Sequence, residues 1–289
     1  MAEVGGTLMN PKASQVLAEV LSNKRVGSYN HMVFAVDGLA AHCKPGNFVA
    51  ISVGGPTSAM ILRRAFAIYR ATMRSDGMGL LELVVAPMGS GSKWLAGAQP
   101  GDRVDLIAPL GTSFGIPTEP VNALLIGGGY GSAPLFALAE TLKQRGCRVD
   151  MVLGASTAGK IYAPLEGKRS VNSLTITTDD GSAGTTGRVS DVLPDLIKEH
   201  EIDVIYSCGP MAMLEAITII AKEFGVVHQC SVEESMACGI GVCMTCVLPV
   251  ESEDGLIRMV RSCIDGPVMD GNKVLWTRSR EVPDGVWGK

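Results

Sequence analysis

The stretch VNALLIGGGYGSAPLFALAETLKQ, residues 121–144, carries the clearest signal of how this chain folds. Its apolar residues 123–126 predict a short buried strand, a run of glycines follows, and residues 133–144 predict a helix. Pro134 suits the first turn of that helix. Glycines between a strand and a helix let a phosphate approach the backbone at the helix N-terminus, so the stretch predicts a nucleotide-binding loop.

The residues after this stretch continue the alternation of strands and helices. Strands are expected at 149–153, 173–177, 204–207 and 226–231, and helices at 190–199 and 212–224. Such alternation predicts a parallel sheet flanked by helices. The loop SCGP at 207–210 joins another strand to a helix at the carboxyl edge of the same sheet, where ligands of open α/β sheets bind.

Both loops have a plainer interpretation. The first fits G-x-G-x-x-G only in part, because Gly127 and Gly129 match but Ser132 replaces the third glycine. A tight strand–helix turn without a ligand therefore remains an alternative for each loop.

The residues before 118 have a different rhythm. Short strand-like runs at 15–20, 31–36, 48–53, 61–69, 80–86 and 103–107 are separated by turn pairs such as Pro45-Gly46 and Asp76-Gly77. Short strands at even spacing predict an antiparallel barrel or sandwich. Within it, LRRAFA at 62–67 places two arginines in a strand-like run. A half-buried arginine there suggests a bound anion, and a surface salt bridge is the alternative. GSGS at 89–92, before a short helical piece at 93–96, is a second possible phosphate cradle.

Four of the eight cysteines lie close together in the last quarter of the chain, at Cys238, Cys243, Cys246 and Cys263. Their spacing, C-x4-C-x2-C-x16-C, is that of plant-type [2Fe–2S] sites. Gly239 and Gly241 allow the loop to turn its N–H groups toward the charged sulfurs, and Ile240, Val242 and Met244 are expected to shield the cluster from water. A structural zinc site is the alternative, but such sites pair two C-x2-C knuckles or add histidines, and this segment has neither.

Composition narrows the class of protein further. The 289 residues are 46% hydrophobic and 19% charged, with a formal net charge of -4 and no block rich in lysine or arginine, so a nucleic-acid partner is not indicated. The longest apolar runs, at 121–129 and 216–221, fall short of the roughly 18 residues of a membrane span. Residues 1–11 lack a basic start followed by an apolar stretch, so we expect a cytoplasmic protein without a disulfide framework.

The barrel arginines, the GSGS loop, the glycine loop, the Cys-Gly-Pro turn and the terminal cysteines occur in an order that resembles the ferredoxin-reductase superfamily. Within it, the chain is similar over nearly its whole length to the electron-transfer subunits of dihydroorotate dehydrogenase B. The most specific matches are EESMACGIGVCMTC at 233–246 and CIDGPV at 263–268, and TDDGS at 178–182 also fits. The resemblance implies FAD, a [2Fe–2S] cluster and NAD as cofactors.

The resemblance also implies which residues bind them. FAD is expected at Arg64, Ala65, Phe66, Ala67, Gly89, Gly91 and Ser92, with Arg64 on phosphate and Gly91 and Ser92 on the pyrophosphate. The nicotinamide nucleotide is expected at Gly128, Gly129, Gly131, Cys208, Gly209 and Pro210, and iron at the four clustered cysteines. The family usually has Arg-Pro-x-Ser where this chain has Ala65 and Ala67, which bears on the tuning of the flavin and not on its binding.

The implied function is an electron relay. A partner subunit containing FMN, the catalytic subunit of dihydroorotate dehydrogenase, oxidises dihydroorotate, and electrons pass one at a time through the [2Fe–2S] cluster to FAD, which reduces NAD+ by hydride transfer. No side-chain acid or base is required at that last step, so no catalytic residue is expected. Similar chains serve hydrogenases, ferredoxin:NADP transhydrogenases or oxygenases, and a zinc-stabilised nucleotide-binding module is the alternative that is not an enzyme.

The expected architecture is therefore an α+β multidomain protein and a subunit of a hetero-oligomer. An antiparallel β-barrel for FAD is expected in residues 1–117, and an α/β parallel-sheet domain for NAD in residues 118–232. A small [2Fe–2S] segment with a polar tail is expected in residues 233–289.

Overall fold

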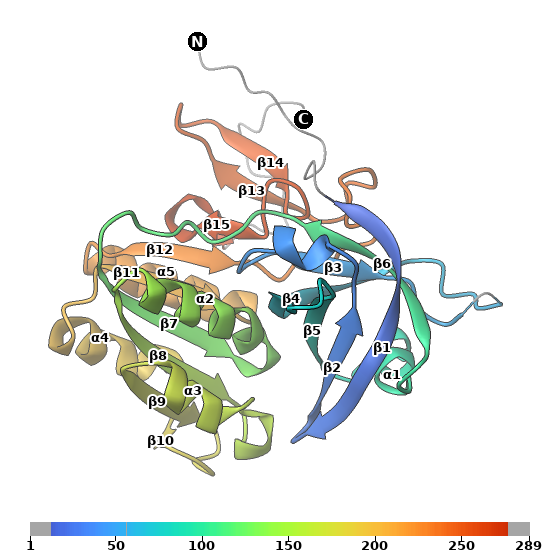
Figure 1. Cartoon of the computed structure of the whole chain (residues 1–289). Helices are drawn as coiled ribbons and strands as arrows, with labels where there is room; N and C mark the ends of the chain where they lie inside the picture. The colour runs from blue at the N-terminus through green and yellow to red at the C-terminus, as the bar shows by residue number, and fades with distance from the viewer. Residues whose placement is uncertain (1–12, 56, 277–289) are drawn as a thin grey trace.

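The computed structural model describes residues 13–55 and 57–276. A β-barrel and a parallel sheet with helices lie side by side, and a small hairpin lies across one end of both (Figure 1). The first residues of the expected barrel domain, 1–12, and the expected polar tail, 277–289, lie outside the described residues. No helix in the described part of the chain is long and apolar enough to cross a membrane.

Six antiparallel strands close into a barrel in the order β1-β2-β5-β4-β3-β6. They are β1 (Ser14–Val26), β2 (Tyr29–Ala35), β3 (Phe48–Ile51), β4 (Arg64–Met73), β5 (Gly79–Val85) and β6 (Arg103–Leu110). The 3-10 turn η1 (Leu39–His42) and the short helix α1 (Ser90–Ala96) pack beside them. Alternate side chains such as Met32, Phe34 and Leu83 fill the interior, which is the expected pattern for a barrel of this size.

The strand expected at 61–69 begins later than predicted. Ile61 is 87% exposed, and β4 starts at Arg64. Arg63 therefore lies outside the strand, where its guanidinium pairs with the carboxylate of Asp105 at 2.7 Å and reaches the Asp105 carbonyl at 3.1 Å. Apolar residues at 61 and 62 suggested a buried strand, but their side chains face solvent.

The parallel sheet has the order β10-β9-β8-β7-β11-β12, and β15 is added antiparallel at its edge. Its strands are β7 (Asn122–Gly128), β8 (Arg148–Ala155), β9 (Ser173–Thr178), β10 (Thr185–Thr186), β11 (Val204–Cys208), β12 (Val227–Ser231) and β15 (Val268–Asp270). The helices are α2 (Ala133–Gln144) and α3 (Pro164–Ser170) on one face, and α4 (Val189–Glu199) and α5 (Met211–Glu223) on the other (Figure 1). The strand order reverses between β7 and β11, and ligands of such sheets bind at that switch point.

The cysteine-bearing segment contains more regular structure than its sequence pattern predicts. It forms the hairpin β13 (Val247–Glu251) and β14 (Ile257–Arg261), and then contributes β15 to the large sheet. Leu248 and Val274 are buried against Leu214 of α5, so an apolar cluster helps to organise the segment. The strands of this segment are too short for a periodic pattern to show in the sequence.

Aromatic side chains pack between the barrel and the helices of the parallel-sheet domain. Tyr69 of β4 contacts Phe136 of α2 and Tyr162, with ring centroids 5.5 and 5.6 Å apart. Arg70 adds ion pairs to Glu140 at 2.6 Å and Glu166 at 2.9 Å. The space between the two bodies therefore has a defined shape.

Candidate functional site

Two adjoining cavities lie between the barrel and the parallel sheet. The first has a volume of about 500 Å³ and the second about 710 Å³. All seven residues expected to bind FAD line the first cavity, which also receives Cys208. Five of the six expected at the nicotinamide nucleotide line the second, and Cys208 is the exception. The structure thus brings the two sets together as neighbours.

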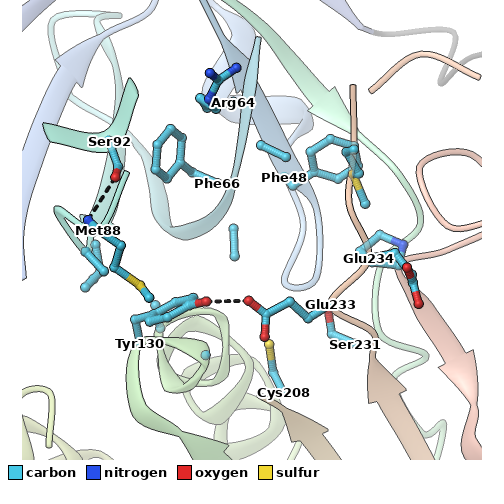
Figure 2. A pocket seen from close by; sticks show the side chains of 18 of the residues that line it. Phe48, Arg64, Phe66, Met88, Ser92, Tyr130, Cys208, Ser231, Glu233 and Glu234 are labelled. Atoms are coloured by element: carbon cyan, nitrogen blue, oxygen red, sulfur yellow. Dashed lines mark hydrogen bonds between the residues drawn. The ribbon is translucent and has the colours of Figure 1, made fainter. Parts of the chain in front are cut away.

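Arg64 and Gly91 meet at the wall of the first cavity, and Figure 2 shows the guanidinium of Arg64 there. A Cβ built on Gly91 lies only 2.8 Å from Nε of Arg64, so the glycine is needed for the guanidinium to lie against the loop. Arg64 donates to the carbonyl of Leu62 at 2.6 Å, and no carboxylate in the described part of the chain pairs with it. A cation beside a glycine loop with open space in front of it fits a phosphate of FAD.

Ser92 shapes the loop that carries Gly91. Its hydroxyl accepts the N–H groups of Met88 and Gly89, both at 3.0 Å, and donates to the carbonyl of Gly89 at 3.2 Å. The hydroxyl is therefore engaged within the loop, so a direct contact between this hydroxyl and a pyrophosphate stays a prediction.

The glycines after β7 let two strand–helix loops pack against each other at the switch point. A Cβ on Gly128 lies 2.8 Å from Sδ of Met213, and one on Gly131 lies 2.8 Å from the carbonyl oxygen of Cys208. Gly129 has a φ of +56°, in the left-handed region. These close contacts account for the glycines in packing terms, while the open second cavity beside them has room for a nucleotide.

Several side chains that line these cavities were not singled out from the sequence. Lys160, Arg188 and Asp179 line the second cavity. The two cations, Lys160 and Arg188, suit the phosphates of a dinucleotide. Asp179 lies within the TDDGS motif at 178–182. Tyr130 and Glu233 line both cavities, and the phenol of Tyr130 donates a hydrogen bond to the Glu233 carboxylate (Figure 2). Tyr130 lay in the quoted glycine loop, yet no local pattern gives its partner.

The thiol of Cys208 lies near this pair at the end of β11 (Figure 2). Burial raises the pKa of the Cys208 thiol to about 12, so it is protonated at neutral pH and carries no charge into the cavity. Beneath it, Ser207 contacts His228 at 2.6 Å, and His228 contacts Thr218 at 3.0 Å. Burial lowers the pKa of His228 to about 3, and the three side chains are buried and line neither of the two cavities, so this group supports the sheet.

The loop that carries three of the four clustered cysteines turns backbone N–H groups toward sulfur, as expected. Ile240 and Val242 donate to Sγ of Cys238 at 3.4 and 3.3 Å. The turn requires Gly239 and Gly241, whose φ angles are +71° and +83°. N–H groups directed at a sulfur in this way suit a cysteine that binds metal.

Of the other three cysteines, Cys243 is exposed, and Cys246 and Cys263 are buried. The hydroxyl of Thr245 donates to Sγ of Cys243 at 3.1 Å and lowers the pKa of that exposed thiol to about 6, which favours the thiolate that binds metal. Cys246 and Cys263 are buried, and burial raises the pKa of Cys263 to about 12. A metal bound there must displace that proton.

The shielding expected around the cysteines is only partly present. Ile240 packs in the apolar cluster of Cys246 and Cys263. Val242 and Met244, however, are 71% and 53% exposed, so the expectation that they shield the sulfurs was wrong. Met244 itself has a positive φ of 57°.

The four cysteines are brought together at one place and fit the ligand set of a [2Fe–2S] cluster. The thiol of Cys243 interacts with Cys238, and the thiol of Cys263 interacts with both Cys246 and Cys238, so the four sulfurs lie near one another. Within the described ranges, no three His, Cys, Asp or Glu side chains are arranged to hold one metal ion. A [2Fe–2S] cluster takes two thiolates on each iron, whereas zinc needs all its ligands at one point.

Comparison with protein families agrees with this arrangement. Residues 233–275 match the model of the iron-sulfur cluster binding domain of dihydroorotate dehydrogenase B, and residues 125–218 match the oxidoreductase NAD-binding domain. The chain is 34% identical over 250 residues to the electron transfer subunit of dihydroorotate dehydrogenase B (NAD(+)) from Desulforamulus reducens, covering 85% of this chain and 92% of the relative. It is 36% identical over 234 residues to the subunit of the same name from Geobacillus kaustophilus, covering 80% and 87%.

Solved structures show the same fold. An NADH-dependent reduced ferredoxin-NADP oxidoreductase, studied for flavin-based electron bifurcation, superposes with a TM-score of 0.80 at 29% identity and covers 91% of both chains. The ferredoxin reductase of carbazole 1,9a-dioxygenase superposes with a TM-score of 0.62 at 25% identity, covering 74% of this chain and 67% of the other.

Proposed function

Because the chain belongs to the family of dihydroorotate dehydrogenase B electron transfer subunits, we propose that it links an FMN-containing catalytic subunit to NAD+. When bound, the [2Fe–2S] cluster supplies one-electron transfer, and FAD, which handles one or two electrons, supplies hydride transfer to NAD+. The oxidation of dihydroorotate belongs to the partner in this proposal, and the cytoplasmic location stays a prediction.

One observation carries the proposal, namely that the first cavity lies between the cysteines and the second cavity. Phe48 and Met236 line the first cavity, and both pack in the apolar cluster of Cys246 and Cys263. On its other side the first cavity shares Tyr130 with the second. Three cofactors bound in this order form a chain of neighbours, which is the geometry that a relay needs.

In this proposal the residues of the chain bind and orient the cofactors and do not transfer protons. Arg64 and the Gly91 loop hold phosphate, and the glycine loop after β7 offers the open cavity to the nucleotide. The Cys208 thiol at the junction stays protonated, since burial raises its pKa to about 12. A hydride carries its own electron pair, so no group in the junction has to act as an acid or a base.

The exposed side of the cysteine loop supports a docking site for the partner. Cys243 is exposed, and the apolar side chains of Val242 and Met244 next to it are 71% and 53% exposed. Apolar side chains that face solvent beside a redox centre suit a protein interface. We place the catalytic subunit here, where electrons have the shortest path to the cysteines.

The function is tested with the chain alone and with the partner. We expect the purified chain to oxidise NADH with an artificial dye and to leave dihydroorotate unchanged, because no (β/α)8 barrel of about 250 residues is among the described elements. Addition of an FMN-containing dihydroorotate dehydrogenase subunit should create dihydroorotate:NAD+ activity. Turnover of dihydroorotate by the lone chain, or a colourless protein that contains zinc, would show that the proposal is wrong.

Arg64→Ala is expected to weaken FAD binding by roughly 10- to 150-fold while leaving the iron content unchanged. The reason is the loss of a charge-assisted contact to phosphate, which contributes about 1.5–3 kcal/mol. Flavin and iron per chain, and FAD affinity from flavin fluorescence, are the measurements. Arg63→Lys is the matched control, since Arg63 pairs with Asp105 and does not line the cavity. Equal loss of FAD in both variants contradicts the assignment.

A further inference from the structure

The junction between the two cavities is occupied by side chains. Six residues line both cavities, namely Ala86, Met88, Tyr130, Gly131, Gly209 and Glu233. Three of the six are glycine or alanine and have no side chain large enough to fill a passage. The other three, Met88, Tyr130 and Glu233, have long side chains, and of these Tyr130 and Glu233 are joined by a hydrogen bond.

Tyr130 and Glu233 are joined across this junction. The Tyr130 hydroxyl donates to the Glu233 carboxylate, and the two residues are 103 positions apart in sequence (Figure 2). Tyr130 comes from the turn η2 (Gly129–Ser132) after β7, and Glu233 from the stretch that leads from β12 to the cysteines. The bond therefore crosses from the nucleotide loop to the cysteine-bearing segment, directly between the two cavities.

The chemistry of hydride transfer conflicts with this closed arrangement. The reacting atoms of a hydride donor and acceptor must come within roughly 3–3.5 Å. A nicotinamide in the second cavity can reach a flavin in the first only through the junction. The phenol ring and the carboxylate both line that junction and are hydrogen-bonded to each other, so their separation opens the way for the two rings to meet.

We propose that the Tyr130–Glu233 hydrogen bond is a bar that closes the passage between the flavin and nucleotide cavities, and that an incoming nicotinamide ring displaces Tyr130 from Glu233. The inference rests on the proposed function in that the second cavity takes the nucleotide. Gly129 beside Tyr130 has a φ of +56°, and a Cβ there meets nothing closer than 3.6 Å, so the backbone next to the bar has room to turn.

The bar lowers the apparent affinity of the chain for the nucleotide. A nucleotide that binds productively only to the open form has its apparent affinity reduced by the fraction of molecules that are open. Removing the phenol hydroxyl frees the ring from the carboxylate and raises that fraction. The bar thus keeps the flavin cavity closed until a nucleotide arrives, and weakens nucleotide binding in return.

The test compares three variants of the chain loaded with FAD and iron. Tyr130→Phe keeps the ring and removes the bond, so we expect NAD+ to bind about five- to ten-fold more tightly by calorimetry. Glu233→Gln keeps a weaker, uncharged acceptor and should give a smaller gain. Tyr206→Phe is the matched control, because it removes a tyrosine hydroxyl that is bonded at 2.9 Å to the Gly115 carbonyl and lines neither cavity, and it should give no gain.

A long-wavelength absorbance band from stacked flavin and nicotinamide gives a second readout, which should saturate at lower NAD+ in Tyr130→Phe. Unchanged or weaker NAD+ binding in Tyr130→Phe and Glu233→Gln, with wild-type binding intact, overturns the bar and leaves the proposed function standing. A wild-type chain that binds no nicotinamide nucleotide contradicts the proposed function and the bar together.

Discussion

Serine in place of Cys243 is expected to abolish electron transfer between dihydroorotate and NAD+ while NADH oxidation by a dye persists. The thiolate is the metal ligand, and a serine hydroxyl keeps its proton at neutral pH. In the wild-type chain the Thr245 hydroxyl lies 3.1 Å from Sγ and lowers the pKa of Cys243 to about 6, so position 243 is prepared for a charged ligand. The dye can draw electrons from FAD directly, so it does not need the cluster.

The measurements are iron and sulfide per chain, coupled turnover with the FMN-containing subunit, and NADH–dye turnover. Cys246→Ser should behave in the same way. Cys43→Ala is the control, because Cys43 follows η1, packs against the barrel interior and donates its thiol to the carbonyl of Leu39 at 3.6 Å, away from the clustered cysteines. Coupled turnover that survives loss of the cluster would falsify the relay.

Local patterns explain why so much of this arrangement could be predicted from the sequence. The strand, glycines and helix of residues 121–144 follow one another directly, so β7, η2 and α2 are set by neighbours in sequence. The cysteine spacing likewise describes a single loop, with Gly239 and Gly241 at the positive φ angles that the loop requires. The resemblance to a known family then ordered these local signals and supplied the cofactors, and the family comparisons confirmed it.

The features that were missed depend on residues far apart in the sequence. The Tyr130–Glu233 bond spans 103 positions, and no spacing rule relates a tyrosine in a glycine loop to a carboxylate after β12. In the sequence, Phe48 is recognisable only as part of an apolar strand. In the structure it lines a cavity and packs against the cysteines, because β3 lies next to the cysteine loop. The strand β15 has three residues and is stabilised by pairing with β12, so its own sequence carries no strand signal.

Gly241→Ala is expected to abolish iron binding at the four cysteines, whereas Gly255→Ala is expected to leave the iron content unchanged. Both glycines have a left-handed backbone, with φ of +83° and +76°, so each alanine costs about 1–2 kcal/mol in strain. The surroundings differ. A Cβ on Gly241 lies 2.6 Å from Cγ1 of Ile264, and one on Gly255 meets nothing within 4 Å. The clash at Gly241 adds about 1–3 kcal/mol.

The structure also shows why the loop cannot simply shift to relieve that clash. The carbonyl of Gly241 accepts a hydrogen bond from Nη1 of Arg261 at 3.0 Å, and the next N–H, that of Val242, donates to Sγ of Cys238. Moving the backbone at 241 away from Ile264 disturbs both bonds, and the second belongs to a cysteine that is proposed to bind iron. Iron per chain and the visible spectrum should therefore collapse in Gly241→Ala and stay near wild type in Gly255→Ala. Equal iron content in the two variants would mean that the loop does not depend on the close approach of Gly241 to Ile264.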